Sequence, residues 1–86
     1  MADYAISVAR SAEKEIANLP GKVLARVEEV IDALSSKPRP IGCKKLAQSR
    51  NRWRLRVGDY RVIYTIDDRS RPVDIERVRH RRFAYR

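Results

Sequence analysis

The sequence predicts a small α+β domain of the order β-α-α-β-β-β, with two N-terminal helices packed on one face of a mainly antiparallel four-stranded sheet. Three observations predict this class. Apolar residues alternate at period two near both ends of the chain, and they recur at helical spacing in between. Clusters of Pro, Gly and Asp separate these segments. Residues 1–86 form one domain, because a chain of this length has too little surface to bury for a second core.

The N-terminal part predicts a strand followed by a helix. Residues 4–8 alternate weakly between apolar and small polar side chains, as in a short strand. Ser11 is the expected N-cap of the helix that follows. Ala12, Ile16 and Leu19 then lie at positions i, i+4 and i+7, which places them on one helical face.

A second helix is expected over residues 22–34, where the apolar stripe is clearest. Prolines at 38 and 40 prevent the helix from continuing. Helices this short need a surface to pack on, and the sheet provides it. The stripe consists of Val23, Leu24, Val27, Val30, Ile31 and Leu34.

The segment 53–66 predicts a β-hairpin with a turn at Gly58-Asp59. Side chains alternate faces along an extended chain, so Trp53, Leu55 and Val57 are expected to face the helices. Arg54 and Arg56 are then expected on the opposite face, whereas the face of Arg61 stays open because residues 60–66 are apolar on both sides.

The remaining segments are a connection and a last strand. Residues 41–52 show no regular pattern, and Leu46 is expected to anchor this connection to the core. A last strand is expected over residues 73–78. Its apolar positions change from odd to even between Ile75 and Val78, which favours a β-bulge near Glu76-Arg77.

A net charge of +9 on 86 residues indicates an anionic partner: nucleic acid, an acidic protein or a membrane surface. The membrane is the weakest of the three, because the chain has no long apolar run and no signal peptide is expected. The single cysteine, Cys43, favours a cytoplasmic protein. With one His and one Cys, no metal site or cofactor is expected.

Basic and aromatic residues are interleaved in the second half of the chain, a pattern that suits single-stranded nucleic acid. The alternative is a solvated basic surface with Trp53, Tyr64 and Phe83 in the core, and composition alone leaves both open. RNA carries its own nucleophile, so arginines could promote cleavage by stabilising the phosphate. His80 has a pKa suited to proton transfer, and Tyr85 could orient a base.

The sequence resembles the RelE branch of the RelE/ParE toxin superfamily. The resemblance rests on W-R-L-R-V-G-D-Y-R-V-I-Y (53–64), R-V-R-H-R-R-F-A-Y-R (77–86) and G-x-K-K-L (42–46), and extends over nearly the whole chain. It implies a RelE-like fold and a bacterial or archaeal toxin of a type II toxin–antitoxin system. The implied activity is that of a ribosome-dependent, metal-independent endoribonuclease that cuts mRNA in the ribosomal A site. The implied products are a 2′,3′-cyclic phosphate and a 5′-hydroxyl.

The resemblance also implies roles for individual residues. Arg61 corresponds to an arginine that stabilises the scissile phosphate, Arg81 to one on the phosphate and leaving oxygen, and Tyr85 to a tyrosine that orients the substrate. Arg54 is expected to clamp the phosphate, and His80 to carry the proton. RNA or ribosome binding is expected from a further set of basic residues: Lys44, Lys45, Arg50, Arg52, Arg56, Arg79 and Arg82.

One departure from the family concerns the general base. Arg52 and Arg54 stand where some members carry lysines with a proposed base role. A guanidinium stays protonated and is a poor base, so proton transfer must fall to His80, to Tyr85 or to electrostatic stabilisation.

The partners implied are the mRNA, the 70S ribosome with its 16S rRNA, and a cognate antitoxin whose acidic segment wraps the toxin. Operator DNA would be bound indirectly, through the antitoxin. The alternative function is a ParE-like toxin that inhibits DNA gyrase without cutting RNA, and the third is a non-enzymatic nucleic-acid-binding module. His80, Arg81 and Tyr85 favour the ribonuclease.

Overall fold

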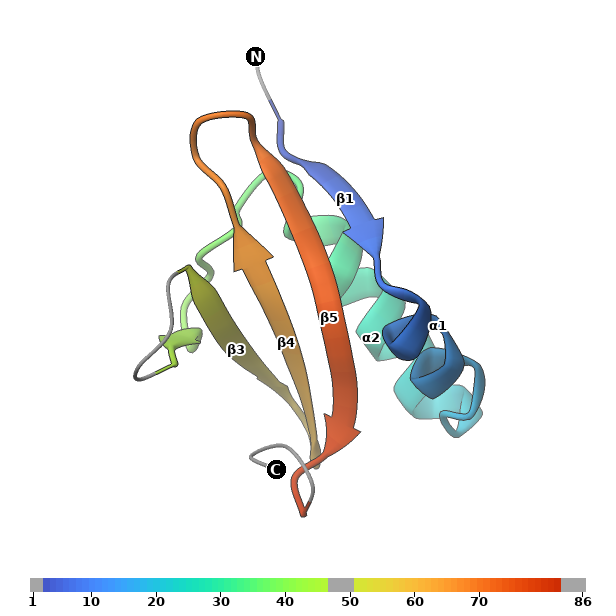
Figure 1. Ribbon diagram of the computed structural model, residues 1–86. Coiled ribbons are helices and arrows are strands. Elements are labelled where there is room, and N and C mark those ends of the chain that lie inside the picture. The colour runs from blue at the N-terminus through green and yellow to red at the C-terminus, as the bar shows by residue number, and fades with distance from the viewer. Residues whose placement is uncertain (1–2, 47–50, 83–86) are drawn as a thin grey trace.

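Two helices and a single five-stranded sheet make up the computed structural model, which describes residues 3–46 and 51–82 (Figure 1). The sheet order is β1-β5-β4-β3-β2, with β1 parallel to β5 and the other neighbours antiparallel. In chain order the elements are β1 (Ala5–Val8), α1 (Arg10–Ala17), α2 (Gly21–Ala33), β2 (Lys44–Lys45), β3 (Arg52–Val57), β4 (Tyr60–Ile66) and β5 (Pro72–His80).

The predicted fold class is confirmed, with one strand more than expected. Strand β2 lies in the segment 41–52 that was predicted to be an irregular connection. Two residues are too few for alternation to be visible in a sequence, and only the pairing of Lys44 with Arg54 and Lys45 with Trp53 makes this a strand. Leu46 is half-buried, and its N–H donates to the carbonyl of Arg52 at 2.9 Å.

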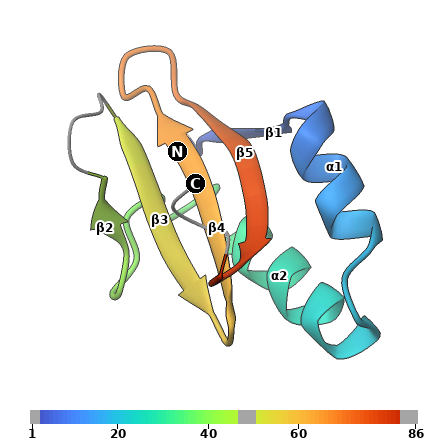
Figure 2. The same cartoon turned by 60° about the horizontal axis from the view of Figure 1, so that its bottom comes forward.

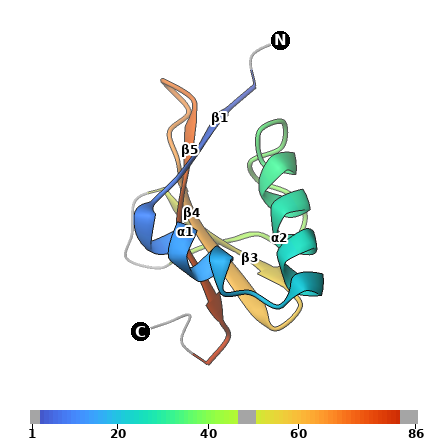
Figure 3. The same cartoon turned by 90° about the vertical axis from the view of Figure 1, so that its right-hand side faces the viewer.

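The helices lie on one side of the sheet (Figure 2 and Figure 3), and the hydrophobic core lies between them and that face. Leu55 and Val57 are buried and Trp53 packs against the core, so the predicted orientation of the hairpin is confirmed. The stripe of α2 supplies Val27, Ile31 and Leu34 to this core. The remaining buried residues of the core are Ala12, Val62, Tyr64, Ile66, Val73, Ile75 and Val78.

The predicted bulge in β5 is confirmed. Tyr64 pairs with Ile75 and Ile63 pairs with Arg77, so Glu76 is one extra residue on β5. The extra residue reverses the alternation and returns Val78 to the buried face.

Helix α1 lies along the outer edge of β5, beyond the point where β1 ends (Figure 1). The predicted N-cap Ser11 is wrong: Ala9 is the N-cap, and it makes no side-chain capping bond. The Ser11 hydroxyl instead donates to the carbonyl of Glu76 at the bulge, at 3.1 Å. The Val78 N–H, at the same edge, donates to the Glu15 carboxylate at 2.9 Å. The helix therefore satisfies backbone groups of an otherwise open sheet edge.

The loop between α2 and β2 is fixed to the far end of the sheet through Asp68 and Tyr64. Arg39 makes two hydrogen bonds to the Asp68 carboxylate, at 2.8 and 3.1 Å, and Tyr4 donates a third at 2.8 Å. The Tyr64 hydroxyl donates to the carbonyl of Pro38 at 2.8 Å. Hydrogen bonds from Arg39 and then Tyr4 lower the pKa of Asp68. These contacts hold the loop that leads into β2.

We predict that Asp68→Asn lowers the melting temperature near neutral pH and has a shrinking effect in acid. Because the pKa of Asp68 is depressed in the folded state, its contribution is complete above its unfolded pKa of about 3.9. That contribution disappears as the pH falls through the lower, folded pKa. Thermal unfolding at about pH 7 and about pH 2 measures the difference. Glu28→Gln, on the exposed side of α2, controls for the lost charge. An equal effect of Asp68→Asn at both pH values would contradict the prediction.

Candidate functional site

The sheet face turned away from the core carries rows of cations. Arg56, Arg61 and Arg79 lie opposite one another across β3, β4 and β5. Like charges in directly opposite positions destabilise a sheet. A row of three arginines therefore has a cost in stability, which an anionic ligand would remove.

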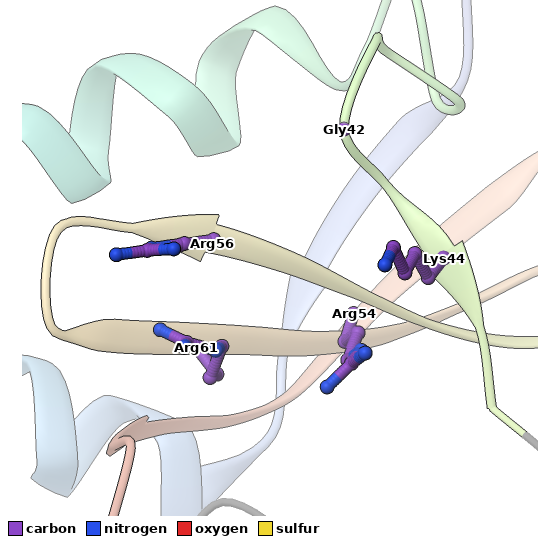
Figure 4. Close-up of a pocket in the computed structure, with 5 residues that line it drawn as sticks. All are labelled: Gly42, Lys44, Arg54, Arg56 and Arg61. Carbon is purple, nitrogen blue, oxygen red and sulfur yellow. The ribbon is translucent and has the colours of Figure 1, made fainter.

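A pocket of about 250 Å³ opens on this face (Figure 4). We call it the cationic pocket, and it is lined by Gly42, Lys44, Arg54, Arg56 and Arg61. Lys44 lies opposite Arg54 in the pairing of β2 with β3, so the short edge strand adds a fourth cation to the three arginines. The structure thus brings Lys44, Arg54, Arg56 and Arg61 together, and it places Arg61, whose face the sequence left open, on the same face as Arg54 and Arg56.

The hairpin turn orients two of these arginines. Gly58 has φ +60°, the conformation that a II′ turn needs at its first central residue and that side chains disfavour. Its carbonyl accepts hydrogen bonds from Arg56 Nε at 3.3 Å and from Arg61 Nη1 at 3.4 Å. The carbonyl of Asp59 accepts a bond from the Arg81 N–H at 2.7 Å, which ties the end of β5 to the same turn.

Arg61 is the electrostatic centre of the cluster. Burial lowers the pKa of Arg61, and the neighbouring charges of Arg56, Arg54 and Arg81 lower it further. A guanidinium remains protonated at neutral pH after such a shift. The lowered pKa therefore reflects burial of the guanidinium first and repulsion from three neighbouring arginines second, and a phosphate group would relieve that repulsion.

Carboxylates divide the remaining cations into paired and unpaired sets. Glu76 forms an ion pair with Arg52 at 3.1 Å. Glu15 does so with Arg79 at 3.3 Å and with Arg77 at 3.5 Å. Four other cations form no ion pair with any residue in 3–46 or 51–82. They are Lys44, Arg56, Arg61 and Arg81. Two of the residues predicted to bind RNA, Arg52 and Arg79, are thus already engaged in ion pairs within the protein.

His80 is not brought together with the arginines. It lies opposite Tyr60, on the face of the sheet that carries Val78, and its ring contacts Tyr60 edge-on at 5.4 Å. Its surroundings are a separate pocket of about 290 Å³ beside α1, which Asn18 and Leu19 also line. The sheet therefore lies between His80 and the cationic pocket.

The other predicted residues divide as follows. Lys45 pairs with Trp53 and so lies on the opposite side of β2 from Lys44. Arg82 is exposed after β5, and its N–H donates to His80 Nδ1 at 3.3 Å. Arg50 and Tyr85 lie outside the described residues.

Within the described ranges, no three side chains of His, Cys, Asp or Glu converge as metal ligands would. Neither described helix has the length and apolar character of a membrane span.

Sequence reasoning missed two residues of the site. Gly42, with φ +97°, lines the cationic pocket, and its place in G-x-K-K-L next to Lys44 was the available signal. Glu15 lies in the charged part of α1, and no sequence pattern links it to arginines more than 60 positions away.

We predict that Arg61→Ala weakens binding of a single-stranded oligoribonucleotide much more than Arg79→Ala. Arg61 forms no ion pair among the described residues, whereas Arg79 already pairs with Glu15. Fluorescence anisotropy over a salt series measures both effects. Losing one phosphate contact should reduce the slope of log affinity against log salt by about 0.7 for Arg61→Ala. Equal slopes for the two variants would show that the ion pairs do not sort the arginines.

Comparison with known proteins identifies relatives along almost the whole chain. Residues 6–85 match the family described as the ParE toxin of the type II toxin–antitoxin system, parDE. Two toxins of Mycobacterium tuberculosis are similar over 84 residues and 96% of this chain: RelG at 33% identity, covering 97% of that protein, and RelE at 32%, covering 87%.

Solved structures show the same fold. The RelBE2 toxin–antitoxin complex of M. tuberculosis matches with a TM-score of 0.80 and 32% identity, over 91% of this chain and 98% of the other. The archaeal RelE–RelB complex from Pyrococcus horikoshii matches with a TM-score of 0.83 and 28% identity, over 95% and 99% of the two chains. The chain therefore belongs to the RelE/ParE superfamily and is a toxin of a type II toxin–antitoxin system.

Proposed function

We propose that this toxin is a ribosome-dependent endoribonuclease that cleaves mRNA in the ribosomal A site. The observation that carries the proposal is the cationic pocket, in which Arg54, Arg56 and Arg61 converge with Lys44. Guanidinium groups bind phosphate oxygens through several donors at once. The similarity to toxins named RelE supports the same activity.

The proposed reaction uses the 2′-hydroxyl of the RNA as nucleophile. Its oxygen forms a bond to the adjacent phosphorus and loses its proton, while the bond from phosphorus to the 5′-oxygen breaks and that oxygen gains a proton. The products are a 2′,3′-cyclic phosphate and a 5′-hydroxyl. Arg54 and Arg61 stabilise the negative charge that builds up on the phosphate oxygens in the transition state.

Proton transfer is assigned without His80. The sheet lies between His80 and the cationic pocket, so a proton from His80 has no direct route to a phosphate held by Arg61. Arg81, whose charge acts on Arg61, is proposed to stabilise the leaving oxygen. Tyr85 is proposed to orient the substrate, and no residue of this chain is required as a strong base if electrostatic stabilisation dominates.

The proposed partners follow from this function. The ribosome would present the mRNA to the cationic face. A cognate antitoxin would neutralise the toxin, as the solved RelB–RelE complexes indicate for relatives. Operator DNA would be reached only through that antitoxin.

We predict that Arg61→Ala and Arg81→Ala each lower mRNA cleavage on translating ribosomes by about 100-fold, because each removes charge stabilisation of the transition state. His80→Gln should retain near wild-type cleavage, because the ring lies on the other face of the sheet. Toe-print mapping of cut sites on ribosomes stalled with a defined A-site codon measures all three variants. Loss of cleavage in His80→Gln at normal stability would return the proton-transfer role to His80. Full activity of the double variant of Arg61 and Arg81 would refute the mechanism.

Inhibition of DNA gyrase is the second candidate, because the matching family description is that of the ParE toxins. Supercoiling by purified gyrase, with and without the toxin, separates the two functions. Under the ribonuclease proposal we expect unchanged supercoiling at toxin concentrations that arrest translation. Inhibition of gyrase together with intact mRNA would favour the ParE-like function.

A further inference from the structure

The carboxylate of Glu15 lies at the edge of β5, where it contacts three groups at once. The pairing of β1 with β5 ends at Ile75, and α1 lies along the edge beyond that point (Figure 1). One oxygen, Oε1, accepts the Val78 N–H at 2.9 Å. The other oxygen, Oε2, lies 3.3 Å from Arg79 Nε and 3.5 Å from Arg77 Nη2. The bond to the backbone holds the carboxylate in place, so it is a fixed anion for both arginines.

The side chain of Arg79 begins on the cationic face of the sheet and ends on the other side. Arg79 lies directly opposite Arg61 in the pairing of β4 with β5, so its Cβ is on the same face as the Arg61 side chain. Its guanidinium nevertheless pairs with Glu15, and both residues line the pocket of about 290 Å³ beside α1. The Arg79 side chain therefore crosses the edge of β5 toward the helix.

The charges that act on Arg61 agree with this displacement. After the larger effect of burial, three neighbouring charges lower the pKa of Arg61 most, those of Arg56, Arg54 and Arg81. The charge of Arg79 is not among these three, although Arg79 occupies the directly opposite position. The carboxylate at the sheet edge thus withdraws one cation from the row of three arginines across β3, β4 and β5.

Partial burial makes these ion pairs strong competitors of an external anion. The side chains of Glu15 and Arg79 are 23% and 26% exposed. The ion pair of Arg52 with Glu76 is more open, with side chains 42% and 37% exposed. Salt screens a half-buried ion pair less than an exposed one. A phosphate group must therefore displace the Glu15 carboxylate before it can bind Arg77 or Arg79.

We propose that Glu15 is a specificity residue of the RNA-binding face. Its carboxylate takes the place of a phosphate group on Arg77 and Arg79, and so restricts RNA to the cationic pocket beside the hairpin turn. The consequence is weak binding of RNA that the ribosome does not present, because fewer guanidinium groups can contact a free strand. The proposal rests on the proposed function for the identity of the anion, but it does not depend on RNA cleavage.

Glu15→Gln tests this role, because the amide keeps an oxygen acceptor for the Val78 N–H and removes the negative charge. Glu13→Gln is the matched control, since it removes the same charge from an exposed position of α1. A third variant combines Glu15→Gln with Arg77→Ala and Arg79→Ala. Fluorescence anisotropy with a single-stranded oligoribonucleotide over a salt series gives the affinity and the salt slope of each purified toxin.

We expect Glu15→Gln to bind the oligoribonucleotide about 10-fold more tightly than wild type at about 50 mM salt, the change for one new charge-assisted contact. The slope of log affinity against log salt should steepen by about 0.7 for each arginine that then contacts a phosphate. Glu13→Gln should change neither quantity by a comparable amount, and the combined variant should return the slope to its wild-type value. Equal affinities and slopes for Glu15→Gln and Glu13→Gln would overturn the proposal. A steepened slope that persists in the combined variant would also overturn it, because the added contacts would then come from other cations.

A measurement on the wild-type toxin does not depend on how the variants fold. Titration with the same oligoribonucleotide, followed through the NMR signals of the guanidinium Nε–H groups, shows which arginines meet a phosphate. We expect the Arg61 signal to shift and the Arg79 signal to stay in place, because Glu15 holds Arg79 Nε. A shift of the Arg79 signal as large as that of Arg61 would contradict the proposal.

The binding assay separates this proposal from the proposed function. If wild-type toxin fails to cut mRNA on ribosomes but Glu15→Gln still gains affinity and salt slope over Glu13→Gln, the specificity role stands and the ribonuclease function falls. If wild-type toxin cuts mRNA and the two variants bind RNA equally, the opposite conclusion follows.

Discussion

The alternation of side chains along β3, β4 and β5 is the constraint on which the rest of this structure depends. It puts Leu55, Val62 and Val78 on one face of the sheet and Arg56 and Arg61 on the other. The apolar face gains enough from packing on α2 and α1 for the arginine row opposite to be tolerated despite its repulsion. The bulge at Glu76 keeps β5 in the same arrangement, because without it Val78 would turn to the cationic face.

Acidic residues refine this arrangement. Glu15 binds the backbone of Val78 and the side chains of Arg77 and Arg79, so one carboxylate both protects the sheet edge and forms ion pairs with two cations. Glu76, the bulged residue, forms an ion pair with Arg52. The cations without an ion pair among the described residues thereby gather near the hairpin turn, where Arg54, Arg56 and Arg81 act on Arg61.

Anchoring of the loop before β2 links stability to the site. The contacts of Arg39 with Asp68 and of Tyr64 with Pro38 hold a loop whose end supplies Gly42 and Lys44 to the cationic pocket. The same loop carries the fully exposed Ile41, which borders an apolar groove between α2 and β3. This short segment thus contributes to the cationic pocket on one side and to an apolar groove on the other, and Arg56 lines both.

The sequence by itself determined the features that depend on local periodicity. The helical stripe of α2, the faces of β3 and the bulge near Glu76 were all predicted, because each shows in residues a few positions apart. The placement of His80 was also accessible, since His80 has the same parity as Val78 and must share its face. His80 and Arg81 are adjacent in the sequence, and neighbouring residues of an extended chain point to opposite faces.

Only the tertiary structure decided which charges remain available. The pairings of Glu15 with Arg79 and of Ser11 with Glu76 join residues more than 60 positions apart, and strand β2 exists only through its pairing with β3. Such contacts have no local signature, because they depend on how α1 meets the edge of β5 and on how the loop crosses the sheet. For this protein, the sequence therefore determined that Arg54 and Arg56 lie on the face opposite the core, and tertiary packing decided where Arg61 lies and which arginines form ion pairs.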